Sequence, residues 1–170
     1  TQSRSSAASD VYKRQMGKMA VIAHGGAGTG PERQKNLQRA VHVASELLLA
    51  GASAVEAAVE ACVVLEDDPV FNAGTGGVFR TDGSVLLDAS IQTSDGRIGF
   101  VIAMSDTPNP IRVAADLLDE PINGLTGLGA RKWADNRGHA NRPVEGREPI
   151  EGDGDCLLYT SDAADDLLCV

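Results

Sequence analysis

Aromatic residues, cysteine and long apolar runs are all scarce in this 170-residue sequence, which has three Phe, two Tyr, one Trp and three Cys. No apolar run is long enough to span a bilayer, and no segment has the charged, apolar and small-residue order of a signal peptide. Basic residues number 15 against 24 acidic ones, and the net charge of −9 argues against nucleic acid or an anionic membrane as partner. The 42% apolar content is typical of one globular domain, for which a cytoplasmic location is expected.

The two ends of the chain differ from the rest. Residues 5–15 resemble the translation of a transposon adaptor used to prepare sequencing libraries, and residues 156–166 resemble its reverse complement in another frame. We therefore predict that residues 1–15 and 156–170 are adaptor-derived tails and not native protein. The alternative is a natural disordered N-terminal tail and an acidic C-terminal tail, which the composition permits. Between the tails only Cys62 remains, and its apolar helical surroundings predict a small core residue with no disulfide or metal cluster.

A short apolar run, Met19 to Ala23, predicts a first strand that enters the glycine-rich turn His24 to Gly28. The turn does not fit a phosphate-binding loop, because it has neither the Gly-x-Gly-x-x-Gly nor the Gly-Lys-Ser/Thr spacing and Pro31 interrupts any helix that follows. Taken alone, His24 is expected to be a hydrogen-bonded structural histidine.

Two helices are predicted next. Apolar residues recur at helical spacing from Leu37 to Leu48, and Gly51 follows as a C-cap. Ser53, with Glu56 three residues later, fits a capping box that opens a second helix. The two helices are expected to pack as a hairpin with their apolar faces on a sheet.

The stretch from Leu65 to Gln92 leaves the second helix, crosses a loop rich in glycine and enters a strand. Asp82-Gly83 predicts a turn between strands 78–80 and 84–92, and Asp95-Gly96 predicts a second turn. Residues 98–104 are nearly all apolar, as expected for a strand covered on both faces. These three strands are expected to form a meander. Asp88 lies within it, and its pattern fits a buried, partnered carboxylate and a solvent-facing side chain equally.

Asn109-Pro110 predicts a helix start, with an Asn cap and Pro at the first helical position, and a further helix is expected from about Leu125 to Asn136. From Arg137 the sequence becomes rich in Gly, Pro, Arg and Glu, and we assign residues 139–155 to a flexible linker. The order of elements predicts an α+β fold.

Four motifs in this order resemble the plant-type (type 2) L-asparaginases, also called isoaspartyl peptidases, which are N-terminal-nucleophile hydrolases. They extend over nearly all of residues 19–138. The motifs are His24-Gly25-Gly26-Ala27-Gly28, Leu65-Glu66-x-x-Pro69-x-Phe71-Asn72-Ala73-Gly74-x-Gly76, Leu87-Asp88-Ala89-Ser90-Ile91 and Asn109-Pro110. Glycosylasparaginase, which has the same fold, ranks second.

The resemblance implies an αββα sandwich, of which residues 16–138 would be the α-subunit half. It implies a precursor that cuts itself before a threonine, an (αβ)₂ assembly with the β-subunit of the same precursor, and hydrolysis of L-asparagine and β-aspartyl (isoaspartyl) dipeptides without a cofactor. The threonine hydroxyl is a weak nucleophile, and the α-amine freed by cleavage takes its proton. By the same resemblance, His24, Gly25, Gly26, Asn72 and Asp88 would support the active site.

The nucleophilic threonine is expected directly after Asp155, but the sequence continues with Cys156 and the adaptor-like tail. The threonine-led strand and the substrate-holding stretches of the family are absent from the sequence, so this chain by itself is predicted to be inactive. Cysteine also serves as an N-terminal nucleophile in this superfamily. The residues after Cys156 do not resemble the strand that should follow, so we do not assign it that role.

The loop from Leu65 to Gly76 resembles the family's stabilisation loop, in which main-chain carbonyls surround a structural sodium ion. The carbonyls that correspond are those of Leu65, Glu66, Asp68, Phe71, Ala73 and Thr75. The same loop closed by hydrogen bonds, with no ion, is the simpler alternative. A third reading of the whole chain, which requires both tails to be native, is a small acidic α+β binding module without enzymatic activity.

Overall fold

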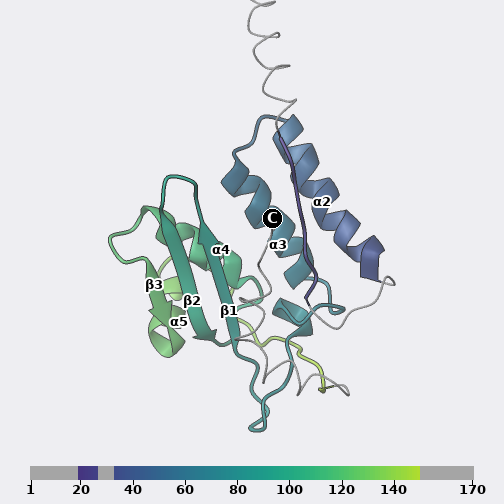
Figure 1. Cartoon of the computed structure of the whole chain (residues 1–170). Helices are drawn as coiled ribbons and strands as arrows, with labels where there is room; N and C mark the ends of the chain where they lie inside the picture. Colours follow the sequence, from purple (N-terminus) through teal and green to yellow (C-terminus); the bar gives the residue numbers. More distant parts are fainter. Residues whose placement is uncertain (1–18, 27–32, 150–170) are drawn as a thin grey trace, which may run out of the picture.

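The structure, a computed structural model, describes residues 19–26 and 33–149 (Figure 1). The helices and strands of these residues are, in order, α2 (Gln34–Leu49), α3 (Ala54–Glu66), the 3₁₀ turn η2 (Gly74–Gly76), β1 (Leu87–Gln92), β2 (Ile98–Met104), α4 (Pro110–Asp116), the 3₁₀ turn η3 (Leu117–Asp119), β3 (Gly124–Thr126) and α5 (Gly127–Asp135). None of the described helices has the length and apolar character needed to cross a membrane. The mixture of helices and a small sheet agrees with the predicted α+β class.

The predicted helix hairpin is confirmed, but its expected packing on the sheet is not, because α4 and α5 cover the described sheet in its place. Gly51 has a φ of +94°, as a helix-ending residue should, and the chain enters α3 directly afterwards. Both bonds of the capping box are present: Glu56 N donates to Ser53 Oγ (3.1 Å) and Ser53 N donates to Glu56 Oε2 (2.8 Å). Helices α2 and α3 therefore lie side by side in opposite directions (Figure 1).

The sheet has the strand order β1-β2-β3, with β1 antiparallel and β3 parallel to β2. The predicted meander is confirmed for its second hairpin, in which Asp95-Gly96 turns β1 into antiparallel β2, and is wrong for its first strand. Residues 78–80 form no strand, although Arg80 N and Ser84 O close the predicted turn at 2.8 Å. Strand β3 was not predicted, because three residues are too few to show an alternating pattern. Helix α4 makes the crossover that lets β3 run parallel to β2.

The predicted first strand is also wrong. Residues 19–26 are extended alongside α2 but are assigned to no helix or strand, and the sheet of the described residues consists of β1, β2 and β3 (Figure 1). A strand exists only where a neighbouring backbone completes its hydrogen bonds, and an apolar run does not specify that neighbour.

Helices α4 and α5 cover one face of the sheet, and α3 packs beside α4. This arrangement creates two adjoining core clusters. The first consists of Val101, Met104, Val113, Leu117, Ala130 and Ala134, with Ala89, Leu125 and Trp133 at its margin. The second consists of Val59, Val63 and Ile111, with Val55, Cys62, Ala89, Ile91 and Ala115 around it. Ala89 contacts both clusters, and Cys62 is partly buried at the margin of the second, in agreement with its predicted place in the core.

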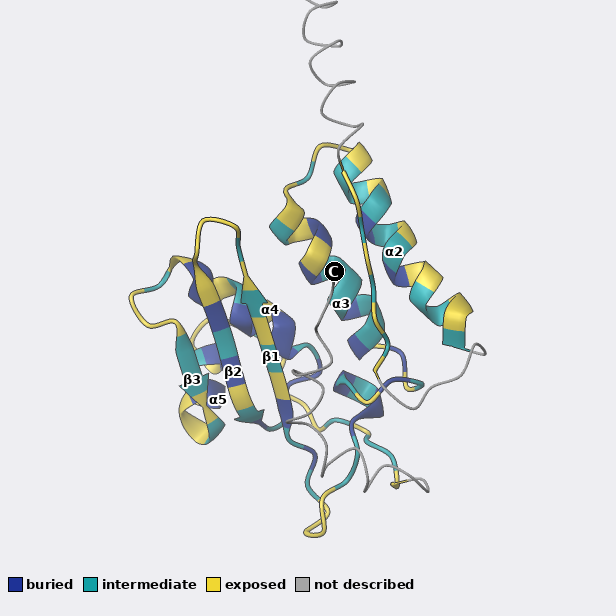
Figure 2. Cartoon of the chain, in the orientation of Figure 1, coloured by how far each residue is buried: buried dark blue, intermediate teal, exposed yellow. Residues whose placement is uncertain are grey.

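The opposite face of the sheet is open in the described residues (Figure 2). Ile98 is 36% exposed and Ile102 48% exposed, and the neighbouring β1 places Ser90 and Gln92 on the same face. The prediction that residues 98–104 are covered on both faces therefore does not hold in this structure. The expected second sheet of an αββα sandwich would pack here.

The start of α4 is stabilised by a residue other than the one predicted. Pro110 occupies the first helical position as expected, but the Asn109 side chain donates to Asp67 Oδ1 (2.9 Å) and makes no capping bond. Instead, Glu66 Oε1 accepts a hydrogen bond from Ile111 N (3.1 Å). The carboxyl group at the end of α3 therefore serves as the cap of α4, which places α3 against α4.

Glu66 is only 6% exposed, and its second oxygen, Oε2, has no hydrogen-bond partner in the described part of the chain. Burial raises the pKa of this carboxyl to about 8, although the bond from the Ile111 amide acts in the opposite direction. At neutral pH the group is therefore mainly protonated, and the core does not have to hold a bare charge.

The raised pKa of Glu66 predicts how the free energy of unfolding changes with pH. Between the usual pKa of 4.5 and about 8, the folded chain keeps a proton that the unfolded chain loses, so the free energy of unfolding should fall as pH rises through that window. The expected slope from this group is up to about 1.4 kcal/mol per pH unit. Glu66→Gln cannot ionise and should lose that slope. Urea unfolding at pH 5, 6.5 and 8, in buffers without sodium, measures it.

Glu46→Gln provides the matched control, because Glu46 is exposed on α2 and the substitution removes the same charge. The control should keep the pH dependence of the parent chain. Equal slopes for the parent and Glu66→Gln would show that Glu66 is ionised in the folded chain.

Candidate functional site

The glycine loop, residues 65–77, follows α3 and turns back on itself within a few residues. Two backbone bonds close its first half, from Asp68 N to Leu65 O (3.3 Å) and from Phe71 N to Asp68 O (3.2 Å). Two more close the 3₁₀ turn, from Gly76 N to Ala73 O and from Gly77 N to Gly74 O, both 3.0 Å. The loop is thus a compact, internally bonded unit.

Glycine is required where this loop folds onto itself. A Cβ on Gly74, which has a φ of +48°, would lie 2.2 Å from the carbonyl oxygen of Glu66. A Cβ on Gly76 would lie 2.0 Å from the carbonyl oxygen of Phe71. Any side chain at either position would push the two halves of the loop apart.

The six carbonyls that the resemblance assigns to sodium all belong to this loop. Four of them accept backbone hydrogen bonds, namely Leu65, Asp68, Ala73 and Thr75. The other two, Glu66 and Phe71, are those that lie against Gly74 and Gly76. An all-oxygen set of main-chain carbonyls suits a hard cation. The residues present therefore fit a bound alkali cation.

The electrostatics of the loop also favour a cation. Glu66 is mainly protonated at neutral pH, but Asp67 and Asp68 follow it at the C-terminal end of α3, where the helix dipole is already negative. Asp68 is buried and accepts bonds from Asn36 Nδ2 (2.7 Å) and Val70 N (3.1 Å), and Arg39 lies 3.8 Å from it. These partners orient the carboxylate of Asp68.

The turn at His24–Gly26 lies against the glycine loop. A Cβ on Gly25 would come within 2.8 Å of Cε1 of Phe71 and 3.2 Å of Cδ2 of Leu37 in α2. Gly26 N donates to His24 Nδ1 (3.2 Å), and this bond shapes the turn. Two motifs almost fifty residues apart in the sequence are therefore in contact through Gly25 and Phe71.

The other two predicted support residues have local structural partners. Asn72 Oδ1 accepts a hydrogen bond from Val78 N (3.2 Å), which bridges the glycine loop to the segment that follows it. Asp88 is exposed on β1, and its Oδ1 accepts a bond from Ala103 N of β2 (2.7 Å). Asp88 thus lies on the open face of the sheet and still has a hydrogen-bond partner. The sequence pattern allowed a buried, partnered carboxylate or a solvent-facing one, and the structure shows one feature of each.

The sequence did not indicate that residues 146–147 belong to this region. Gly146 N donates to Thr75 O (3.1 Å), Arg147 N donates to Gly77 O (2.9 Å), and Phe79 N donates to Arg147 O (2.9 Å). Val78 and Arg147 form a parallel β-bridge. Because glycine is common in loops of every kind, Gly146 carried no recognisable signal within the predicted linker.

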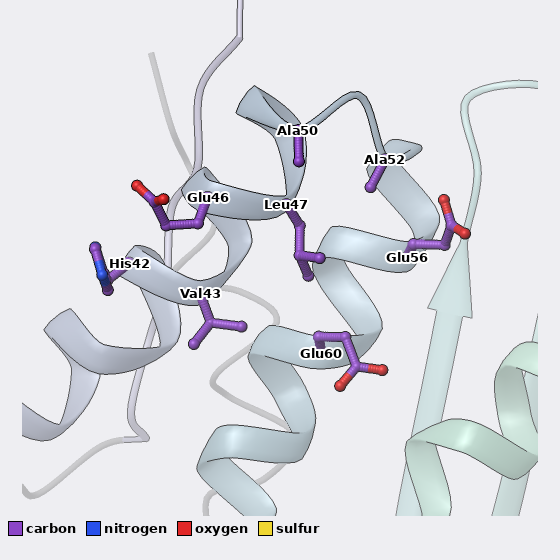
Figure 3. Close-up of a pocket in the computed structure, with 8 residues that line it drawn as sticks. All are labelled: His42, Val43, Glu46, Leu47, Ala50, Ala52, Glu56 and Glu60. Atoms are coloured by element: carbon purple, nitrogen blue, oxygen red, sulfur yellow. The ribbon is translucent and has the colours of Figure 1, made fainter.

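A hollow in the described part of the chain lies elsewhere, between α2 and α3 (Figure 3). It has a volume of about 760 Å³ and is lined by His42, Val43, Glu46, Leu47, Ala50, Ala52, Glu56 and Glu60. Val43 and Leu47 point between the helices, Glu60 pairs with Arg112 at 2.7 Å, and none of the predicted site residues is among the lining.

In residues 19–26 and 33–149, no group of three or more His, Cys, Asp and Glu side chains is placed to hold a metal ion. A site built from main-chain carbonyls is of a different kind.

Four predicted positions lie outside the described residues. These are Ala27 and Gly28 of the first motif, Asp155 at the expected cleavage site, and Cys156. The described part of the site consists of the His24–Gly26 turn, the glycine loop, Asp88 and the segment at 146–147.

Comparison with known proteins identifies the family. Residues 17–146 match the family described as Asparaginase. The chain is 41% identical over 134 residues to an isoaspartyl peptidase/L-asparaginase of Macaca fascicularis, which covers 74% of this chain and 43% of the relative. It is 36% identical over 135 residues to the mouse protein of that name, and 39% identical over 124 residues to a plant-type L-asparaginase of Pyrococcus abyssi, which cover 75% and 68% of this chain.

The matched region spans only 40% to 43% of these relatives' own length. The predicted resemblance is nevertheless confirmed by two independent comparisons, one with a family and one with individual proteins. This chain belongs to the asparaginase family.

Proposed function

We propose that the protein from which this chain derives hydrolyses the side-chain amide of L-asparagine and the β-aspartyl bond of isoaspartyl dipeptides. The contact between Gly25 and Phe71 carries the proposal, because it joins the two motifs that the resemblance assigns to the active site. The names of the relatives favour this reading over a glycosylasparaginase. The family membership speaks against the binding module.

In this proposal the chain supports the chemistry and does not perform it. The nucleophile is a threonine expected after Asp155, freed when the precursor cuts itself, and its α-amine takes the proton of its hydroxyl. Asn72 and Asp88 hold neighbouring segments through Val78 and Ala103. The 170-residue chain alone is therefore proposed to be inactive.

The proposed partner is the β-subunit of the same precursor. The open face of the sheet, with Ile98 and Ile102 exposed, is the surface that a second sheet would cover in an αββα sandwich. Asp88 lies on the same face, so the β-subunit would meet it directly. Two such αβ units would make the (αβ)₂ assembly.

Two purified proteins test the activity: this chain, and residues 16–155 joined to the reading frame that follows in the source DNA. Only the joined protein should cut itself into two pieces and release aspartate from L-asparagine and from a β-aspartyl dipeptide. The reason is that the 170-residue chain has no threonine followed by the family's nucleophile strand. Gel electrophoresis and an aspartate assay measure the two steps.

Replacement of the expected threonine by alanine in the joined protein should abolish both steps. Activity of the 170-residue chain that disappears in Cys156→Ala would instead make Cys156 the nucleophile and contradict the adaptor reading. A joined protein that neither cuts itself nor releases aspartate would overturn the proposed function.

We also propose that the glycine loop binds one sodium ion through the carbonyls of Leu65, Glu66, Asp68, Phe71, Ala73 and Thr75. Its role would be structural, since it would hold the halves of the loop together at the negative end of α3. The support for it is the all-oxygen donor set and the close approach of Gly74 to Glu66.

Thermal unfolding of the chain in sodium chloride and in choline chloride of equal ionic strength tests this site. Sodium at ten times its Kd should raise Tm by about 3 °C. Gly74→Ala should remove that increase, because its Cβ would collide with the Glu66 carbonyl, and should destabilise the chain by roughly 2 kcal/mol or more.

Gly83→Ala is the matched control. Gly83 also has a positive φ, +78°, but nothing lies within 4 Å of an added Cβ. This variant should lose about 1 kcal/mol through backbone strain and keep the full sodium effect. An equal sodium effect in Gly74→Ala would place the ion outside the loop.

A further inference from the structure

The segment of residues 139–149, here called the strap, connects α5 to the last described residue and is attached to the molecule at two places. At its beginning, buried Arg131 of α5 donates to Ala140 O (3.1 Å) and His139 O (3.4 Å). The same guanidinium donates to Thr107 Oγ1 and to Asp106 O. Arg142 N also donates to Asp106 O (3.0 Å), so the first attachment joins the strap to the loop before α4.

At its far end the strap pairs with the edge of the glycine loop. The three backbone bonds of Gly146 and Arg147 with Thr75, Gly77 and Phe79 make a short parallel ladder. Gly146 has a φ of +66°, and a Cβ there would lie 2.6 Å from Cγ2 of Val85 and 2.7 Å from Cε1 of Phe79. This position therefore requires glycine both by conformation and by space. We call the paired residues, 75–79 with 146–147, the strap seat.

The strap seat and the proposed cation share one atom. Thr75 O accepts the hydrogen bond of Gly146, and it is also one of the six carbonyls of the proposed sodium site. A carbonyl oxygen has two lone pairs, so both interactions are compatible. Each of them fixes the same peptide group, and the conformational entropy of ordering it is lost only once when both are made.

We propose that the cation and the strap are coupled, so that sodium in the glycine loop holds Gly146–Arg147 in the strap seat and the seated strap raises the sodium affinity. This inference rests on the sodium site proposed above. The coupling is reciprocal by thermodynamic necessity. Its consequence is that the chain just before the proposed cleavage segment is held more firmly when the loop carries the cation.

Limited digestion of the full 170-residue chain with trypsin tests the coupling. Arg147 is the cleavage point in the strap seat, because the bond after Arg142 precedes Pro143 and is resistant. Arg80, in the exposed turn closed by Ser84, is an internal reference. In sodium chloride, compared with choline chloride, cleavage after Arg147 should slow roughly tenfold while cleavage after Arg80 stays the same. Mass spectrometry of the fragments gives both rates.

Two glycine variants separate the strap seat from general stability. Gly146→Ala should raise the rate of cleavage after Arg147 and remove the sodium effect on it. Gly138→Ala has the same kind of strain, with φ at +77°, but nothing lies within 4 Å of its added Cβ, so it should be slightly less stable and keep the parent chain's sodium effect on cleavage after Arg147. Unchanged cleavage after Arg80 would show that both variants remain folded.

Sodium binding is measured separately by the broadening of its ²³Na resonance. Binding without selective protection of Arg147, or equal protection of Arg80, would overturn the coupling and leave the sodium site standing. No broadening would overturn the sodium site and the coupling together. Selective protection in the parent chain and in Gly138→Ala, lost in Gly146→Ala, is the result that we expect.

Discussion

The carbonyl of Glu66 lies so close to Gly74 that a single added carbon would fall 2.2 Å from its oxygen, and the path of the chain after α3 depends on this contact. It turns the glycine loop back over the end of the helix, which places Phe71 against Gly25 and exposes the edge of residues 75–79 to the strap. Three segments that are far apart in sequence thus meet at one loop. A residue other than glycine at position 74 would separate them all.

The side chain of Glu66 also connects two segments, because it joins the end of α3 to the start of α4. Its Oε1 caps α4, while burial removes the water that would stabilise a charge on the carboxylate. One backbone hydrogen bond to a charged group is worth about 1.5 to 3 kcal/mol, and burial of an uncompensated carboxylate costs more. The desolvation cost is therefore larger than the gain from the hydrogen bond, and the pKa of Glu66 rises. The neutral form also avoids repulsion from Asp67 at the negative end of the helix.

Local patterns predicted the local structure well. Apolar periodicity, a capping box and Gly51 located α2 and α3, and the bounds of β2 matched its apolar run. Predictions that depended on a distant partner failed: residues 19–23 and 78–80 found no neighbouring strand, and Asn109 bonded Asp67 while Glu66 capped α4. The motifs identified the family and the loop. The contact of Gly25 with Phe71 and the attachment of the strap arise only from tertiary packing.

Asp88 bonds the irregularity that turns the end of β2 into the core. Two residues of β2, Ile102 and Ala103, lie opposite Asp88 between the pairs Ala89–Val101 and Leu87–Met104, and this β-bulge breaks the alternation. It brings Met104 into the core at 0% exposure, where regular pleating would have turned it outward. The bulge forces Ala103 to a φ of +53°, which costs about 1 to 2 kcal/mol. The bond from Ala103 N to the Asp88 carboxylate is worth about 1.5 to 3 kcal/mol, and with the burial of Met104 it outweighs the strain.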